Sequence, residues 1–167
     1  MMSEKRYILT AAEAAQKLHR MSLQLAENLS GNIAPVILVG IRNNGVVLAA
    51  KIEILLKQYI PNPIQTISLQ MDKQHPVAVQ LSGQVELDGA NVILIDDVAN
   101  SGKTMLYALK PLLEYHPRSI QTMVLVERMH KLFPVNPDYV GLSLATTQED
   151  HIQVETEGGE VTGAFVV

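Results

Sequence analysis

The feature that most constrains the fold of this chain is a pair of short, uninterrupted apolar runs, at 36–39 and at 92–95. Runs of this length are too short for helices, and apolar side chains at every position predict strands that are covered on both faces. Each run leads into a helical pattern, over 45–59 and over 103–115. Strands that alternate with helices imply βαβ crossovers, so we expect an α/β fold with a central, mainly parallel sheet flanked by helices.

The rest of the chain contributes further elements. Thr10 and Glu13 form a capping-box pattern that begins an amphipathic helix over 10–29. A hairpin is predicted over 77–87, because apolar and polar residues alternate on both sides of a turn at 82–84. The other predicted strands span 64–69, 120–126, 138–142, 152–156 and 163–167.

Composition limits the class of protein. The chain has 167 residues, of which 47% are apolar, so we expect 1–167 to form a single domain with a substantial core. We expect no membrane partner, since no apolar run approaches the roughly 18 residues that span a bilayer. The absence of cysteine fits a reducing compartment, for which the cytoplasm is the default. A formal charge of −4 argues against a protein that holds nucleic acid by neutralising many phosphates.

The most informative segment is 91–104, a predicted buried strand that ends in two adjacent carboxylates, Asp96 and Asp97. Ligands of open parallel sheets bind at the carboxyl ends of the strands. Behind the carboxylates, a turn at 101–104 opens a helix, whose first N–H groups and positive dipole end favour a phosphate. The segment therefore offers acceptors for sugar hydroxyls next to donors for a phosphate, as a phosphorylated ribose requires.

Two other interpretations of this segment have to be weighed. Asp96 and Asp97 could simply cap the turn that follows them. The tetrapeptide at 101–104 also matches the end of a nucleotide-binding P-loop. The glycine that this motif needs five positions before Gly102 falls on Asp97, however, where a carboxylate would repel a triphosphate. An ATPase or kinase of the P-loop type is therefore disfavoured.

Residues 91–104 resemble the ribose-5-phosphate signature of type I phosphoribosyltransferases: a hydrophobic strand, two acidic residues, three variable residues and a phosphate turn, in this order. Nearly the whole chain is similar to the bifunctional pyrimidine-operon attenuator/uracil phosphoribosyltransferase family. The segments that carry this resemblance are 37–46, 91–104, 125–134 and 138–141. It implies the type I phosphoribosyltransferase fold, with a small hood assembled from terminal and late segments.

The resemblance also implies a reaction, in which the ribose-5-phosphate of phosphoribosyl pyrophosphate passes to a nucleobase, uracil or another pyrimidine, to give a nucleoside monophosphate. Asp96 and Asp97 would be catalytic and bind the ribose hydroxyls, and Mg²⁺ would bridge pyrophosphate and sugar. Other substrate-binding residues would be Ser101, Gly102, Lys103 and Thr104 for the 5-phosphate, Arg42, Asn43 and Asn44 for pyrophosphate, and Glu127, Arg128 and Met129 for the base.

The chain departs from the family at two arginine positions, which carry Asn44 and Met71 here. Both arginines would meet the leaving group, so their absence favours an alternative, a catalytically weakened nucleotide-sensing or regulatory module. Regulation through RNA uses an arginine-rich face in this family, of which Lys17, His19 and Arg20 remain, and we expect an ordinary solvated surface there instead. The family further implies a homodimer or higher homo-oligomer. The five histidines are too scattered in sequence to predict a protein metal cluster.

Overall fold

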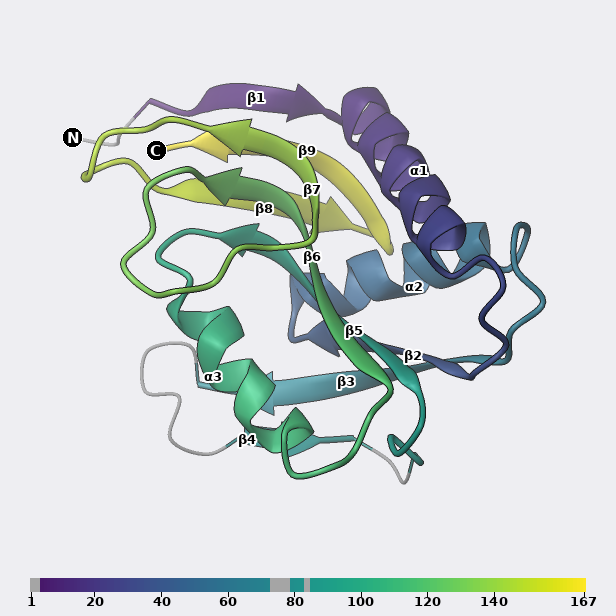
Figure 1. The fold of residues 1–167 in the computed structure, drawn as a ribbon. Helices are drawn as coiled ribbons and strands as arrows, with labels where there is room; N and C mark the ends of the chain where they lie inside the picture. Colours follow the sequence, from purple (N-terminus) through teal and green to yellow (C-terminus); the bar gives the residue numbers. More distant parts are fainter. Residues whose placement is uncertain (1–3, 73–78, 83–84) are drawn as a thin grey trace.

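The computed structural model describes residues 4–72, 79–82 and 85–167. None of the helices within these ranges is long and apolar enough to cross a membrane. In chain order the elements are β1 (Arg6–Thr10), α1 (Ala11–Asn28), β2 (Val36–Ile41), α2 (Asn44–Leu56), β3 (Ile64–Met71), β4 (Val79–Leu81), β5 (Asn91–Ala99), α3 (Lys103–Leu112), β6 (Ser119–Arg128), β7 (Tyr139–Leu144), β8 (Ile152–Glu157) and β9 (Glu160–Val166) (Figure 1).

The main sheet has the strand order β4-β3-β2-β5-β6-β7. Five of its strands are parallel, and β4 pairs antiparallel with β3 at one edge. From β2 the chain moves to β3 on one side, whereas β5, β6 and β7 lie on the other side. The strand order therefore reverses between β2 and β5, where Gly40 pairs with Ile95. In open α/β sheets, ligands bind outside the carboxyl ends of the strands at such a switch point.

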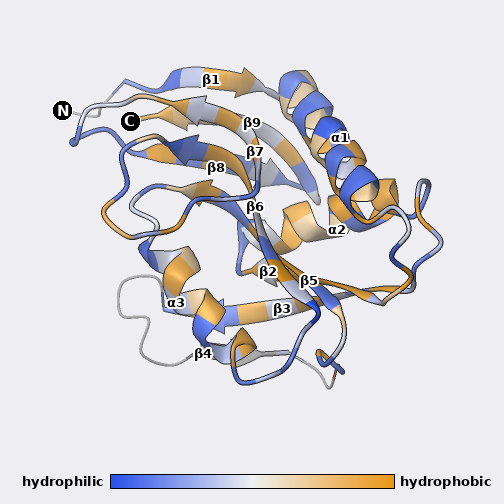
Figure 2. Ribbon diagram, in the orientation of Figure 1, coloured by the Kyte–Doolittle hydropathy of each residue, from blue (hydrophilic) through white to orange (hydrophobic). Residues whose placement is uncertain are grey.

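The central strands are buried on both faces, as the two apolar runs predicted. Every residue of β2 is buried, and alternate side chains enter two different cores. Val36 and Leu38 pack with α1 and α2 on one face, whereas Ile37 and Val39 pack with α3 on the other. Figure 2 shows the same apolar character along β2 and into β5. Helices on both faces confirm the predicted α/β architecture.

A second sheet has three antiparallel strands in the order β1-β9-β8, and we call it the hood. It packs buried side chains, among them Leu9, Val154 and Ala164, into the core that α1 and α2 share with the main sheet. The hood thus joins the first strand of the chain to the last two (Figure 1), as the resemblance implied. The sequence pattern missed β1, because only Leu9 of its five residues is buried and its partner β9 lies at the other end of the chain.

The helices begin as predicted but two of them end early. α1 begins at the predicted capping box, in which the Glu13 N–H donates to Thr10 Oγ1 at 3.2 Å. α2 ends at Leu56 and α3 at Leu112, each a few residues short of the predicted end. Beyond these residues the backbone forms i→i−3 turns, such as that of Tyr59 with Leu56, ahead of a proline that cannot continue the helix.

The hairpin predicted over 77–87 is wrong in its pairing. β4 pairs with the end of β3, with Leu81 opposite Leu69, and 85–87 is not a strand. Leu87 is instead buried in the core that contains α3. Alternation indicated a strand at 79–81 but could not identify its partner, which is the end of β3. Residues 77–78 and 83–84 of this prediction lie outside the described part of the chain.

Candidate functional site

Two adjoining clefts open at the carboxyl ends of β2 and β5. The first cleft has a volume of about 330 Å³ and is lined by the end of β5, the turn before α3 and part of β8. The second cleft has a volume of about 400 Å³ and is lined by the turn after β2 and the end of β3. Asn44 and Asp97 line both clefts, so these two residues stand at the boundary between them.

The two carboxylates of β5 are almost fully buried, with Asp96 1% and Asp97 9% exposed. Asp96 Oδ1 accepts a hydrogen bond from the Asp97 N–H at 2.9 Å, and Asp97 Oδ1 accepts one from the Val98 N–H at 2.8 Å. Both N–H groups belong to β5 itself, so these two bonds do not cap the turn at 101–104. Asp97 Oδ2 accepts a hydrogen bond from Asn44 Nδ2 at 2.9 Å. Both carboxylates also line the first cleft, where they can accept from the hydroxyls of a sugar.

The turn at 101–104, which the sequence predicts to bind a phosphate and which we call the phosphate turn, lies in the same cleft. Gly102 is the N-cap of α3 and has φ +85°, a conformation that favours glycine. Ser101 Oγ accepts the Lys103 N–H at 3.2 Å, and the first N–H groups of a helix lack intrahelical partners. Ser101, Gly102 and Thr104 line the cleft, whereas Lys103 lies outside its lining. The two carboxylates and the turn that opens α3 therefore line one cavity, and phosphate binding by this turn stays a prediction.

The phosphate turn is held from behind by the segment that follows β6. The N–H groups of Leu132 and Phe133 both donate to Ser101 O at 3.0 Å. A Cβ atom on Gly102 would lie 3.2 Å from Phe133 O, so there is little room for a larger residue at the turn. These contacts fix the turn relative to the sheet, which pre-organises its N–H groups for an anion.

The turn after β2 forms the second cleft, whose described lining is Arg42, Asn43, Asn44, Gln70, Met71, Asp72 and Asp97. The peptide bond between Arg42 and Asn43 is cis. A Cβ atom on Gly45 would lie 2.6 Å from Ile95 O and 3.2 Å from Asp96 Cα. Only glycine therefore lets α2 begin this close to the end of β5, which brings the predicted pyrophosphate loop beside the carboxylates.

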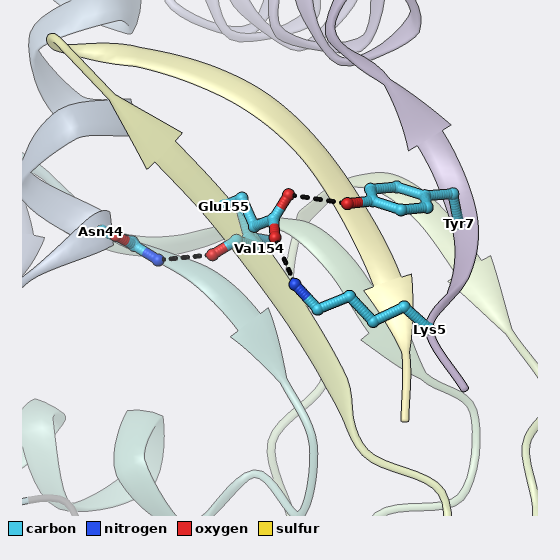
Figure 3. Close-up of polar contacts among 5 residues, drawn as sticks. All are labelled: Lys5, Tyr7, Asn44, Val154 and Glu155. Atoms are coloured by element: carbon cyan, nitrogen blue, oxygen red, sulfur yellow. Dashed lines mark hydrogen bonds and ion pairs between the residues drawn. The ribbon is translucent and has the colours of Figure 1, made fainter. Parts of the chain in front are cut away.

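The hood contributes residues that sequence reasoning missed. Ile152, Gln153 and Val154 of β8 line the first cleft. Asn100 Oδ1 accepts the Ile152 N–H at 3.2 Å, and Asn44 Nδ2 donates to Val154 O at 2.9 Å (Figure 3). These contacts join residues at least 52 positions apart. The sequence pattern carried no signal for them, because a strand prediction does not show where the strand docks.

The residues predicted to contact the base have other partners in the structure. Arg128 is 9% exposed, and its Nε donates to Thr146 Oγ1 at 2.9 Å. Glu127 forms an ion pair of 2.6 Å with Lys131, and Met129 is 60% exposed. Glu127, Arg128 and Met129 are not among the described residues that line these two clefts. Contact of these side chains with a base stays a prediction.

Glu155 of β8 forms contacts with the opposite edge of the hood, at and just before β1. Its carboxylate accepts hydrogen bonds from Lys5 Nζ at 2.8 Å and from the Tyr7 hydroxyl at 3.1 Å (Figure 3). The hydrogen bond with Lys5 lowers the pKa of Glu155 and raises the pKa of Lys5. Lys5 Nζ also lies 4.3 Å from the ring centroid of Phe165, a cation–π contact. This cluster connects β1 across β9 to β8, the strand that forms one wall of the first cleft.

Comparisons with known proteins agree with this arrangement. The family profile of the phosphoribosyl transferase domain matches residues 7–157. The bifunctional protein PyrR of Roseiflexus sp. is 32% identical over an alignment that covers 99% of this chain and 96% of the relative. The bifunctional protein PyrR of Enterococcus faecalis is 31% identical over 162 residues, which cover 92% of this chain and 90% of the relative.

Solved structures share the fold at lower sequence identity. The hypoxanthine phosphoribosyltransferase of Trypanosoma cruzi superposes with a TM-score of 0.79 at 16% identity, covering 96% of this chain and 95% of that one. A hypoxanthine-guanine phosphoribosyltransferase from Bacillus anthracis gives a TM-score of 0.75 at 18% identity, covering 99% of both chains. The main sheet and the hood are therefore a known combination.

Proposed function

Because this chain belongs to the phosphoribosyl transferase domain family, we propose that it transfers the ribose-5-phosphate of phosphoribosyl pyrophosphate to a nucleobase. Uracil or another pyrimidine is the proposed base, since the chain resembles the attenuator/uracil phosphoribosyltransferase family and its curated relatives are PyrR proteins. The observation that carries the proposal is the first cleft, in which Asp96 and Asp97 face the phosphate turn at the switch point of the sheet.

The reaction breaks the bond between C1 of the ribose and the pyrophosphate oxygen, and forms a bond from C1 to a ring nitrogen of the base. The proton of that nitrogen is released together with the pyrophosphate. Positive charge develops on the sugar as pyrophosphate leaves. Asp96 and Asp97 are almost fully buried, so their charge stabilises the developing cation more strongly than it would in solution. The phosphate turn holds the other end of the sugar, so that the ring is oriented for attack.

The oxygen-rich lining of the clefts fits a divalent cation. Asp72, Asp96 and Asp97 supply carboxylate oxygens, the ligand type that Mg²⁺ prefers. The described residues include no group of three or more acidic or histidine side chains that could hold a metal ion by themselves. We propose that oxygen atoms of the substrate would supply most of the ligands of Mg²⁺ beside these carboxylates, and that the ion would neutralise charge on the pyrophosphate. Arg42 is the cationic side chain among the described residues of the second cleft, and we propose that it also meets the pyrophosphate.

Calorimetry with phosphoribosyl pyrophosphate and Mg²⁺ tests the substrate. We expect the wild-type protein to bind. In a steady-state assay of pyrophosphate release, Asp97→Asn should lower kcat/KM by about 10²- to 10³-fold, the range found when one group that stabilises transition-state charge is removed. Asp88→Asn is the matched control, because Asp88 is exposed and its Oδ1 accepts the His116 N–H outside both clefts. Absence of binding by the wild type would contradict the proposal.

A panel of nucleobases, read by pyrophosphate release in the presence of phosphoribosyl pyrophosphate and Mg²⁺, tests the second substrate. We expect release with uracil or another pyrimidine and no release without a base. If the protein binds phosphoribosyl pyrophosphate but releases nothing with any base, the sensing alternative replaces the transferase.

A further inference from the structure

We propose that Asn44 and Asn100 are positioning residues that hold hood strand β8 against the two substrate loops. The proposal rests on the proposed phosphoribosyl transfer, because it takes the 42–45 turn as the pyrophosphate loop and the 101–104 turn as the phosphate loop. Neither asparagine needs to touch substrate for this role. Each acts by fixing the wall of the first cleft relative to Asp97 and to the phosphate turn.

Asn44 connects a catalytic carboxylate directly to the hood. It is the first residue of α2, and its Nδ2 donates to Asp97 Oδ2 and to Val154 O, both at 2.9 Å. Its Oδ1 accepts a hydrogen bond from Thr156 Oγ1 at 3.0 Å. An arginine, which the family has at this position, carries donors only and could not accept from Thr156. The amide is therefore suited to a link with the hood, not to neutralising a leaving group.

Asn100 makes the corresponding link from the phosphate loop. It lies between the carboxylates and Ser101, and its side chain exchanges two hydrogen bonds with one backbone residue of β8. Asn100 Nδ2 donates to Ile152 O at 3.3 Å, and Asn100 Oδ1 accepts the Ile152 N–H at 3.2 Å. This pattern reproduces the two bonds that a neighbouring strand would make.

The two asparagines occupy an otherwise open sheet edge. β8 is the outer strand of the hood, with β9 on its other side. Backbone groups of residues two apart point to the same edge of a strand, so Ile152 and Val154 present theirs together. Edge groups of this kind need partners when they are not in water, and here the two substrate loops provide them.

This arrangement couples the hood to the sugar site. Ile152, Gln153 and Val154 form one wall of the first cleft, so the asparagine bonds set its width. Asp97 Oδ2, which accepts from Asn44, belongs to the carboxylate proposed to bind a ribose hydroxyl. A ribose hydroxyl that donates to Asp97 Oδ2 would therefore bind the same oxygen as the Asn44 amide, which also holds β8 through Val154 O.

Hydrogen exchange in the absence of any ligand tests the link from Asn100. Asn100→Ala removes the partner of the Ile152 N–H, and we expect that amide to exchange about tenfold faster, as loss of one net hydrogen bond predicts. Asn28→Ala is the matched control, since Asn28 Nδ2 donates to the Tyr139 hydroxyl at 2.7 Å and lines neither described cleft. Exchange at Ile152 should not change in that variant.

Steady-state kinetics test the link from Asn44. Asn44→Ala should raise KM for phosphoribosyl pyrophosphate and lower kcat, each about three- to tenfold, the effect of one or two hydrogen bonds. Asn44→Asp should be worse, because it keeps the volume and the acceptor for Thr156 but sets a carboxylate oxygen against Asp97 Oδ2 and Val154 O. A residue that only filled space would give the opposite order.

The outcomes separate the two proposals. If Asn44→Ala and Asn100→Ala match the Asn28→Ala control in kinetics and in exchange at Ile152, the positioning role is overturned while phosphoribosyl transfer stands. If wild-type protein fails to bind phosphoribosyl pyrophosphate, the proposed function is lost, and the exchange experiment still decides whether the asparagines hold β8.

Discussion

Gly45 sets how closely the turn after β2, our proposed pyrophosphate loop, approaches the carboxylates of β5. The position that its Cβ would take is 2.6 Å from Ile95 O and 3.3 Å from Asp96 Oδ1. The two nearest atoms, Ile95 O and Asp96 Cα at 3.2 Å, belong to the backbone and cannot turn aside as the end of a side chain can. The position of Asp96 relative to α2 therefore depends on Gly45, a residue without a side chain.

Gly45→Ala should lower the free energy of unfolding by about 1–3 kcal/mol, because the added methyl group forces the backbone apart. Affinity for phosphoribosyl pyrophosphate should also fall, because the added methyl group displaces Asp96. Denaturant unfolding and calorimetry measure the two effects.

Gly31→Ala is the control for this variant. Gly31 has φ +79° and nothing within 4 Å of its Cβ position, so substitution there costs about 1 kcal/mol from backbone conformation alone. A Gly45→Ala protein that is no less stable than Gly31→Ala and binds normally would contradict the close-packing argument.

At the scale of elements, Thr10 joins the hood to the first helix. It is the last residue of β1, where it pairs with Gly163, and it is also the N-cap of α1. The reciprocal capping bonds with Glu13 fix the direction in which the chain leaves the hood.

Thr10→Ala should lower the free energy of unfolding by about 1 kcal/mol, the usual effect of losing an N-cap side chain. Thr10→Ser keeps the hydroxyl and should retain most of that stability. Thermal unfolding followed by circular dichroism compares the two variants, and equal losses would show that the hydroxyl does not cap α1.

The Lys5–Glu155 contact predicts a pH dependence for the hood. The pKa of Glu155 lies below its ordinary value of 4.5, so the stabilisation is present above pH 4.5 and is lost as pH falls through the lowered pKa. The pKa of Lys5 lies above its ordinary value of 10.5, so at the alkaline end the stabilisation is present below pH 10.5 and is lost as pH rises.

An acid titration followed by the backbone NMR signals of β1 should therefore show a transition with its midpoint below pH 4.5. Glu155→Gln should remove this transition, because the amide does not titrate. Glu114→Gln, at an exposed position after α3, should leave it in place. A transition that persists in Glu155→Gln would assign it to another group.

At the scale of the whole molecule, charge and surface contacts argue against an RNA-binding face. The formal charge is −4. Arg20 donates to Val140 O at 3.0 Å and to Gly141 O at 2.7 Å, and His19 Nε2 lies 2.8 Å from the Tyr59 hydroxyl. Two of the three residues that remain of the family's basic face are therefore engaged in contacts within the protein.

We expect no retention of RNA in a filter-binding assay at either about 50 mM or about 200 mM salt, the range over which phosphate-driven binding changes most clearly. Binding at the lower concentration that disappears at the higher one would contradict this expectation, and would identify an electrostatic face that the net charge conceals.

Much of the fold and part of the site could be predicted from the sequence, because those signals are local. Apolar residues at every position of β2 and β5 follow from burial on both faces, and the capping box of α1 lies within four residues. Asp96, Asp97 and the phosphate turn are neighbours along the chain, so their proximity in space needed no tertiary information.

The sequence by itself therefore determined the α/β class and indicated the segment to which we assign the chemistry. Only the tertiary structure decided the partner of β4, the inclusion of β1 in the hood and the docking of β8 on Asn44 and Asn100. The physical reason is that a residue's own pattern records how much of it is buried, whereas the identity of the group that buries it depends on segments far away in the chain.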